Sequence, residues 1–518
     1  MNSEGKNQPL PSKQLFSYYT FKARKLFLFF LLFRIINALF VNSFFDPDEY
    51  WQSMEVAHNF VFGYGYLTWE WAQAIRSFIH PAIFSIGYFI LKLFRIDFPW
   101  LVQWTPRFTQ AFFLAIQDIS IYSLSLRLFP ITQNNSDRFN LEVGKWTVIC
   151  QVFSWFTWYC GIRTYSNCLE GVLILLGLLY WPLPYERATR SQLYLALFYA
   201  GFSVAIRPTA GIFWAILTLY ILIGPYSIPK LKFLFYAFVM GLLWIGILLI
   251  SDRLFFGYWV FVPLNFLKFN VIRGVSDFYG THPAHWYFSN ALPVILLSLL
   301  PAFIFGCFQL LKTLFTVSVQ PPEKHRGGFL LVCIFGYILF FSVLGHKEFR
   351  FLYPILPLML LVSGYGITSF LQKFKIPGIK NSWKFVIIVL LLLPNIPMAI
   401  YFSSYHQVGT IQAVEYIRKH EEVHSAYFLL PCHQTPFYAF IHRPISLRFP
   451  TCAPPTGEDY SLVNYQTETS EFLKNPLEFT YSLFPTTGMP THIVTYDKIA
   501  QKIQPFFKDF KYQEVRIS

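Results

Sequence analysis

Long apolar stretches recur from residue 26 to residue 403, and they constrain the fold more than any other feature. Most of them approach the length that a helix needs to cross the hydrocarbon core of a membrane, which is about 20 residues. Charged residues lie mostly between the stretches and make up only 13% of the chain. A soluble protein carries roughly twice that share. We therefore predict a polytopic membrane protein.

The apolar stretches predict an all-α membrane domain with about 11 to 12 transmembrane helices. Lys and Arg residues gather in alternate loops, as the positive-inside rule describes for cytoplasmic loops. The rule assigns residues 44–80 and 251–290, and everything after residue 403, to the opposite side. Twelve complete spans would return the C-terminus to the cytoplasm. We therefore expect the stretch 145–160 to be re-entrant or interfacial.

Three parts follow from this organisation. Residues 1–25 are basic and precede the first span without a cleavage pattern after it, which predicts a cytoplasmic N-terminal tail and an uncleaved anchor. Residues 26–403 form the multispan domain, which we expect to be catalytic. Residues 404–518 have mixed polarity and ordinary charge, so we predict a small α/β-type domain on the far side.

The net charge of +14 would suit nucleic acid in a soluble chain. Here the basic residues cluster between apolar runs and form no stripe, so we exclude a nucleic-acid partner. Cys432 and Cys452 are the only cysteines of the far-side domain. An oxidising compartment would allow them to bond, and both the bonded and the reduced pair remain open from the sequence.

Carboxylates and aromatic residues gather in the first far-side loop. A carboxylate there can act as a general base if a substrate hydroxyl lies within reach. The acids are Asp46, Asp48, Glu49, Glu55 and Glu70, and only one or two of them can point at a common site. The alternative is an interfacial segment with anchoring aromatics and solvated acids. We favour a sugar-binding loop, because the acids begin where the first span ends. The expected acceptor-binding residues are Trp51, Gln52, Trp69, Glu70 and Trp71.

A charged turn, His346-Lys347-Glu348-Phe349-Arg350, separates two later apolar runs. Ionisable side chains at a membrane boundary are costly unless they bind something. Positive-inside bias cannot explain cations on the far side. Lysine as a point charge and arginine as a planar fork suit a phosphate group. An internal ion pair with Glu348 is the alternative.

Arg163 and Arg207 interrupt apolar sequence at the same boundary. Phosphate contact and snorkelling at a helix end are both open for them. His282 and His285 lie three residues apart, but no third ligand is near in sequence, so we expect no metal site.

Two of these segments carry a resemblance to a known family. Pro47-Asp48-Glu49 and the run from His346 to Phe351 resemble the signatures of the dolichyl-phosphate-mannose-dependent α-mannosyltransferases, the multispan GT-C enzymes of glycosyltransferase family 22. Within that family the chain is most similar to the GPI mannosyltransferase III branch. The stretches that carry this further likeness are residues 47–52, 64–71, 206–210, 431–436 and 452–455.

The resemblance implies transfer of the third mannose, α-1,2-linked, from dolichyl-phosphate-mannose to the GPI precursor glycolipid in the lumenal leaflet of the endoplasmic reticulum membrane. A β-linked donor and an α-linked product need one inversion, which we expect Asp48 to serve as base and Glu49 to assist. His346, Lys347 and Arg350 would neutralise the departing dolichyl phosphate. A phosphate needs no proton from an acid, and we expect no cofactor or metal. The resemblance specifies no protein subunit.

Two kinds of alternative remain. A sister mannosyltransferase would add the fourth GPI mannose or extend the dolichol-linked oligosaccharide. A lipid scramblase or flippase would use the acidic loop only to gate headgroups, and it would move lipid without a sugar donor.

Overall fold

The computed structural model describes residues 12–129, 137–316, 321–373, 382–455 and 465–515. Within them, six helical segments are long and apolar enough to cross a membrane, and three shorter apolar helices accompany them. The all-α membrane domain is thus confirmed, and the total of about 11 to 12 spans stays a prediction. The six segments are Pro99–Leu128, Lys230–Phe256, Tyr287–Phe315, Lys324–Val343, Phe349–Lys373 and Lys384–Lys419.

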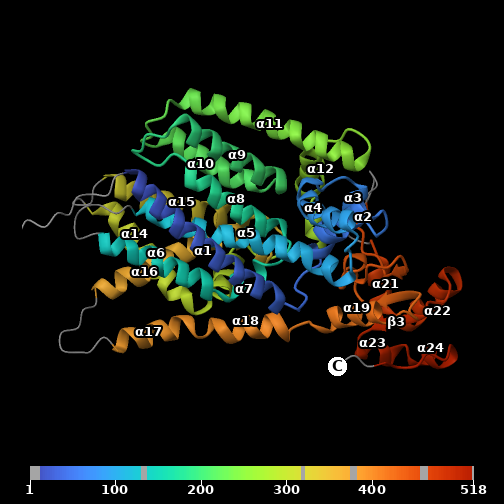
Figure 1. Cartoon of the computed structure of the whole chain (residues 1–518). Helices are drawn as coiled ribbons and strands as arrows, with labels where there is room; N and C mark the ends of the chain where they lie inside the picture. Colours follow the sequence, from blue (N-terminus) through green and yellow to red (C-terminus); the bar gives the residue numbers. More distant parts are fainter. Residues whose placement is uncertain (1–11, 130–136, 317–320, 374–381, 456–464, 516–518) are drawn as a thin grey trace, which may run out of the picture.

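Most helices of the membrane domain run side by side, with α11 on one face and α17 and α18 on the opposite face (Figure 1). The bounds are α1 Ser12–Phe40, α4 Ile79–Phe94, α5 Pro99–Leu128, α6 Asp137–Phe153, α7 Trp155–Cys160, α8 Ser166–Tyr180, α9 Arg190–Ile206, α10 Ala210–Ile223, α11 Lys230–Phe256, α13 Leu292–Leu296, α14 Leu300–Phe315, α15 Pro321–Val343, α16 Leu356–Lys373, α17 Ser382–Leu392 and α18 Asn395–Ser404.

Three boundaries differ from those expected from the sequence. Helix α1 begins at Ser12, so the segment expected as a tail continues the first helix, and residues 1–11 lie outside the described part. The stretch 145–160 is divided at Ser154, whose side chain accepts a hydrogen bond from the backbone of Thr157 and starts α7. Helix α11 reaches Phe256, beyond residue 251.

Small residues allow α16 to lie at the centre of the bundle. A Cβ atom at Gly364 would come within 2.5 Å of the Thr147 backbone nitrogen, and one at Gly366 within 2.1 Å of the Ala302 carbonyl oxygen. Such close backbone approach is a common way for membrane helices to associate. Helices α6 and α14 therefore pack directly on α16.

A buried ion pair joins the first helix to the bundle. Arg34 of α1 contacts Asp118 of α5 at 2.6 Å, and Gln151 of α6 donates to the same carboxylate at 3.1 Å. A charged pair inside a membrane domain is tolerated when its members satisfy each other.

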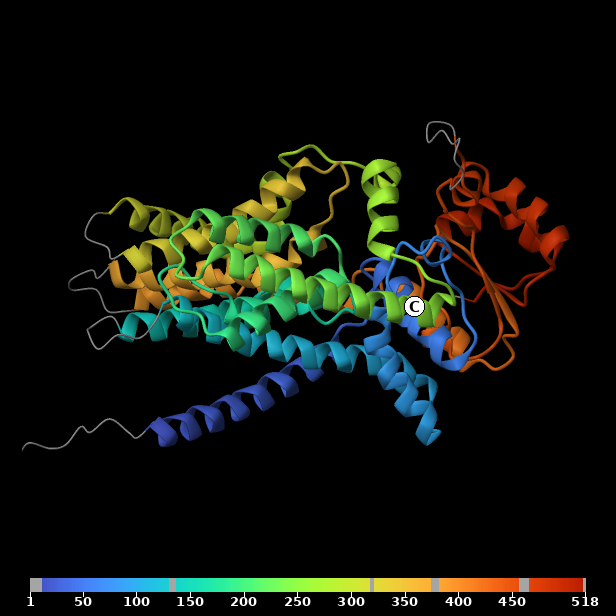
Figure 2. The ribbon, with the colours of Figure 1, turned by 90° about the horizontal axis from the view of Figure 1, so that it is seen from above.

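Residues after 403 form the predicted α/β domain at one end of the bundle, beside α2 and α3 (Figures 1 and 2). Its three-stranded parallel sheet has the order β2-β1-β3, with Ser425 opposite Ser446 and Ala426 opposite His492. The bounds are α19 Gly409–Lys419, β1 Ser425–Leu429, α20 Tyr438–Ile441, β2 Ser446–Arg448, α21 Glu468–Lys474, α22 Pro476–Thr487, β3 His492–Thr495, α23 Asp497–Lys502 and α24 Gln504–Asp509.

Short helical segments connect or interrupt the long helices. They are π-helix η1 Tyr50–Met54, α2 Glu55–Phe62 and α3 Trp69–Ala72 in the first loop, and α12 Val262–Leu267, η2 Lys268–Ile272 and η3 Val275–Tyr279 in the second. Three others lie inside candidate membrane segments: η4 Tyr287–Ala291 and η5 Leu297–Leu299 in Tyr287–Phe315, and η6 Phe349–Ile355 at the start of Phe349–Lys373.

Glu55 of the first loop forms hydrogen bonds with the C-terminal domain. Its carboxylate accepts hydrogen bonds from the backbone amides of Phe437, Tyr438 and Ala439 at 2.7, 3.0 and 3.1 Å. Burial raises the pKa of Glu55 to about 7, although these amides lower it. The two parts are therefore docked through a buried polar contact.

Candidate active site

Arg350 gathers three carboxylates from the two segments that the sequence singled out. Its guanidinium lies 3.2 Å from Asp46, 2.7 Å from Asp48 and 3.0 Å from an oxygen of Glu348. Asp46 and Asp48 precede η1, whereas Glu348 and Arg350 stand at the start of η6. Two motifs about 300 residues apart in the sequence thus form one ionic cluster at the end of the membrane domain.

The surroundings of Asp46 favour its protonated form. The backbone amide of Asp48 donates to Asp46 at 3.0 Å. Burial, together with the nearby charges of Glu348 and Asp48, raises the pKa of Asp46 to about 8, although Arg350 lowers it. Asp46 is therefore largely protonated at neutral pH, and Asp48 remains the candidate base.

His346 belongs to the same cluster. Its Nε2 atom lies 2.8 Å from Glu348, and Nδ1 lies 2.8 Å from the carbonyl oxygen of Gly280. Burial alone would lower the pKa of His346, but Glu348 raises it above the usual value. Burial alone would raise the pKa of Glu348, but Arg350 and His346 hold it well below its usual range. Glu348 thus favours the protonated, cationic form of His346, which would suit an anion.

Lys347 points into the backbone of its own turn. Its ammonium donates to the carbonyl oxygens of His282 and Leu344, the former at 2.8 Å. Burial lowers the pKa of Lys347, and Asp277 opposes that change. The structure thus separates Lys347 from the group that His346 and Arg350 form.

Glu49 points away from Asp48 and is fully buried. It lies 3.1 Å from Arg107 and 2.5 Å from Arg163, and Arg163 also donates to the carbonyl oxygen of Ser43 at 2.9 Å. The structure therefore does not bring Glu49 and Arg163 to the candidate base and phosphate site. Both instead hold the first loop against α5 and the segment after α7.

Arg207 is also paired within the protein. It lies 3.2 Å from Glu170, and its guanidinium lies 4.8 Å from the centre of the Phe351 ring. Phe351 follows Arg350 by one residue, so Arg207 is close to the cluster without an ion pair to it. Arg207 and Arg76 also line one cavity of about 20 Å³, with Leu248 and Phe266 in its wall.

The five residues expected to bind an acceptor separate into two groups. Trp51 and Trp71 are each 2% exposed, and Gln52 is 8% exposed. Trp71 donates to the Trp51 carbonyl oxygen at 3.1 Å, which places both indoles in the packed interior. They cannot offer a ring face to a sugar in this arrangement. Trp69 and Glu70 are partly exposed.

Besides contacting Arg350, the Asp48 carboxylate affects the pKa of side chains in three other segments. They are Glu70 and Arg76 of the first loop, Tyr279 of the second loop and His433 of the C-terminal domain. Arg76, Tyr279 and His433 were not predicted from the sequence as site residues. His433 lies in the stretch 431–436 that carries the family likeness, whereas Tyr279 had no signal beyond an aromatic-rich loop.

Cys432 and Cys452 form a disulfide, with their Cα atoms 5.8 Å apart. His433 follows Cys432 in the chain, and its Nδ1 atom lies 3.6 Å from the sulfur of Cys452. The three side chains are close enough to suggest a metal site, but the two sulfurs are bonded to each other and offer no thiolate. The disulfide therefore crosslinks the turn that carries His433 to the segment around Cys452.

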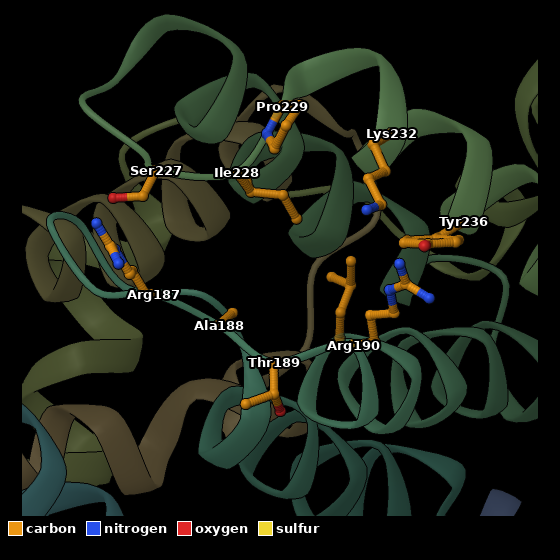
Figure 3. Close-up of a pocket in the computed structure, with 10 residues that line it drawn as sticks. Arg187, Ala188, Thr189, Arg190, Ser227, Ile228, Pro229, Lys232 and Tyr236 are labelled. Carbon is orange, nitrogen blue, oxygen red and sulfur yellow. The ribbon is translucent and has the colours of Figure 1, made fainter.

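A larger cavity, of about 260 Å³, lies at the opposite end of the bundle, where α9 and α11 begin (Figure 3). Arg187, Arg190 and Lys232 line it without a carboxylate. Its lining offers no general base, so it is not a candidate for the catalytic centre.

Comparisons with known proteins give a consistent result. The model of the Alg9-like mannosyltransferase family matches residues 25–442. The chain is 38% identical to GPI alpha-1,2-mannosyltransferase 3 of Homo sapiens, over 95% of this chain and 83% of that protein. It is 37% identical to mannosyltransferase APTG1 of Arabidopsis thaliana, over 95% of this chain and 88% of that protein.

A solved structure shows the fold. ArnT from Cupriavidus metallidurans, in a structure bound to undecaprenyl phosphate, superposes with a TM-score of 0.54 at 10% identity, over 96% of this chain and 95% of that one. The expected GT-C fold is thus confirmed. By sequence, the chain belongs to the Alg9-like mannosyltransferase family.

Proposed function

We propose that this protein transfers the third mannose, in α-1,2 linkage, from dolichyl-phosphate-mannose to the GPI precursor. The observation that carries the proposal is the contact of Arg350 with Asp48 at 2.7 Å, which unites a base with a phosphate-binding group. The likeness to GPI alpha-1,2-mannosyltransferase 3 over 95% of the chain supports the choice of acceptor.

The reaction is a single displacement at C1 of the donor mannose. Asp48 accepts the proton of the acceptor hydroxyl while that oxygen bonds to C1. The bond from C1 to the phosphate oxygen breaks, and the electron pair leaves with dolichyl phosphate. Arg350 and His346 neutralise the charge that develops on the phosphate. Asp46, Asp48 and Glu348 share Arg350 in the structure. A donor phosphate would take over part of that contact and free Asp48 for the acceptor.

The proposed donor is lipid-linked. Arg350 and His346 supply the cations for its phosphate group. The ArnT structure contains a polyprenyl phosphate, undecaprenyl phosphate, which supports this donor class. The leaving phosphate needs neither an acid nor a divalent cation, so the proposed reaction is metal-independent.

The proposed location is the endoplasmic reticulum membrane, with the ionic cluster and the C-terminal domain on the lumenal side. The Cys432–Cys452 disulfide supports this orientation, because disulfides persist in an oxidising compartment.

The test is a transfer assay with the purified full-length chain, labelled dolichyl-phosphate-mannose and a two-mannose GPI precursor. The wild type should add one α-1,2-linked mannose, and Asp48→Asn should not. Asp497→Asn, an exposed aspartate of the C-terminal domain, is the matched control and should act like the wild type. Transfer only to a three-mannose GPI or to a dolichol-linked oligosaccharide would favour a sister enzyme. Lipid movement without donor and without transfer would favour a scramblase.

A further inference from the structure

One turn of the C-terminal domain packs against Trp51, three residues after the candidate base Asp48. The indole nitrogen of Trp51 donates to the carbonyl oxygen of His433 at 3.1 Å, and the two rings lie 5.3 Å apart. The His433 ring also lies 4.9 Å from Phe449, which in turn lies 5.5 Å from Trp51. His433 has a φ of +61°, a conformation that residues with a Cβ rarely adopt. The preceding disulfide and these two rings together hold it in place.

The imidazole of His433 is suited to a neutral hydroxyl group. Burial lowers its pKa to about 4, although Asp48 opposes that change, so the ring is uncharged at physiological pH. A neutral imidazole donates one hydrogen bond and accepts another. Nδ1 faces the sulfur of Cys452, and within the described residues Nε2 has no hydrogen-bond partner.

Tyr279 of the second loop stands beside this turn. It is 47% exposed, and its hydroxyl donates to the Cys452 carbonyl oxygen at 3.4 Å. The charges of Glu70 and Asp48 both act on it. An exposed aromatic ring fixed by its hydroxyl, with carboxylates nearby, has the components of a sugar subsite.

The charges at this position favour a sugar over a phosphate. Tyr279 and His433 are uncharged at physiological pH. Glu70 is a carboxyl group, so none of the three side chains carries a positive charge that would attract a phosphate. Arg76, a cation of the first loop, is paired with Glu70 at 2.8 Å. Arg350 and His346, which suit an anion, belong to the cluster around Glu348.

We propose that Tyr279, His433 and Glu70 form the subsite that binds the acceptor mannose, and that the C-terminal domain thereby selects the acceptor. The inference rests on the function proposed above. The ligand is a neutral hexose, whose hydroxyls bond to His433 and Glu70 while its face packs on Tyr279. His433 and Tyr279 are binding residues and take no part in proton transfer.

The test measures the KM of each substrate with purified full-length variants. His433→Ala and Tyr279→Ala should raise the acceptor KM about tenfold, the effect of one or two lost contacts, and leave the donor KM within about twofold. His433→Gln, whose amide both donates and accepts, should recover part of the loss. His424→Ala and Tyr258→Ala are the controls: His424 is exposed on the same domain, and Tyr258 is 51% exposed on the same loop as Tyr279.

A reductant provides an arm that needs no substitution in the subsite. Cys432 and Cys452 form the disulfide, and the other five cysteines are free and buried. Dithiothreitol should raise the acceptor KM of the wild type and leave a Cys432→Ser/Cys452→Ser variant, already weakened, unchanged.

The outcomes separate the two proposals. An unchanged acceptor KM in Tyr279→Ala and in reduced wild type, or an equal rise in both KM values, would overturn the subsite. A wild type that transfers mannose to no acceptor would instead overturn the proposed function. If His433→Ala fails to fold, the Tyr279 variant and the reductant decide.

Discussion

Arg350 lies 2.7 Å from Asp48, so the residue proposed to hold the leaving phosphate directly contacts the residue proposed to activate the acceptor. The two sides of the reaction therefore share one guanidinium. Binding of an anionic donor and exposure of the base are coupled by this contact, because the guanidinium must divide its donors between them.

Replacing the two aspartates separately should distinguish their roles. Asp48→Asn removes the proton acceptor and should lower kcat by about 100-fold or more, whereas Asp46→Asn should cost much less. Single-turnover assays on variants with unchanged melting temperature provide the measurement. An Asp46→Asn variant as inactive as Asp48→Asn would contradict the assignment.

Asp46 should make the protein sensitive to alkaline pH. Its pKa is raised from 3.8 to about 8, so the folded protein retains a proton that the unfolded chain has lost. Stability therefore falls as the pH rises from about 4 to about 8. Asp46→Asn removes this loss and should melt above the wild type at pH 8.5. The melting temperatures of Asp46→Asn and the wild type should converge near pH 4. The control Asp497→Asn should show no such pH-dependent difference from the wild type.

Glu49→Gln should damage stability more than substrate binding. It leaves Arg107 and Arg163 buried without a carboxylate, a loss of about 3–5 kcal/mol for a broken buried ion pair. Thermal unfolding in detergent measures it. A variant that melts like the wild type but has lost activity would restore Glu49 to the catalytic machinery.

Arg350→Lys should preserve the positive charge but lose the planar guanidinium that contacts several oxygen atoms at once. A lysine cannot contact several carboxylates and a phosphate through a planar fork, so we expect kcat to fall and the donor KM to rise. Arg190→Lys, at the opposite end of the bundle, is the control. Wild-type kinetics in Arg350→Lys would show that charge alone suffices.

Removal of divalent cations should have no effect. The proposed leaving group is stabilised by Arg350 and His346, so the transfer rate in excess chelator should equal the untreated rate. A rate that falls with chelator and returns with added Mg²⁺ or Mn²⁺ would show that a metal takes part.

Two features could be predicted because they depend on local sequence. Apolar stretches determine membrane helices wherever they occur, and each of the two charged signatures is a short continuous stretch of sequence. The prediction for two neighbouring residues had different results. Asp48 and Glu49 are adjacent, but the backbone is already helical at both residues, and successive side chains of a helix point in different directions. Glu49 therefore faces Arg107 and Arg163, while Asp48 faces Arg350.

The acceptor side was less predictable because it depends on distant contacts. Trp51 has the composition of a sugar platform, but it packs on Phe437 and Phe449 of a domain that follows much later in the chain. Tyr279 is positioned for its proposed role by the hydrogen bond that its hydroxyl donates to the Cys452 carbonyl oxygen. No periodicity or short motif reports such pairings.

The hydrogen bond from Trp51 to His433 joins residues 382 positions apart. The ribosome must therefore synthesise most of the chain before the turn around His433 can pack on Trp51. The membrane helices precede that turn in the chain, so they are made before the proposed site can be completed. Newly made molecules pass through an inactive, membrane-integrated stage. A nonsense mutation just before residue 425 would leave a protein that enters the membrane normally and transfers no sugar.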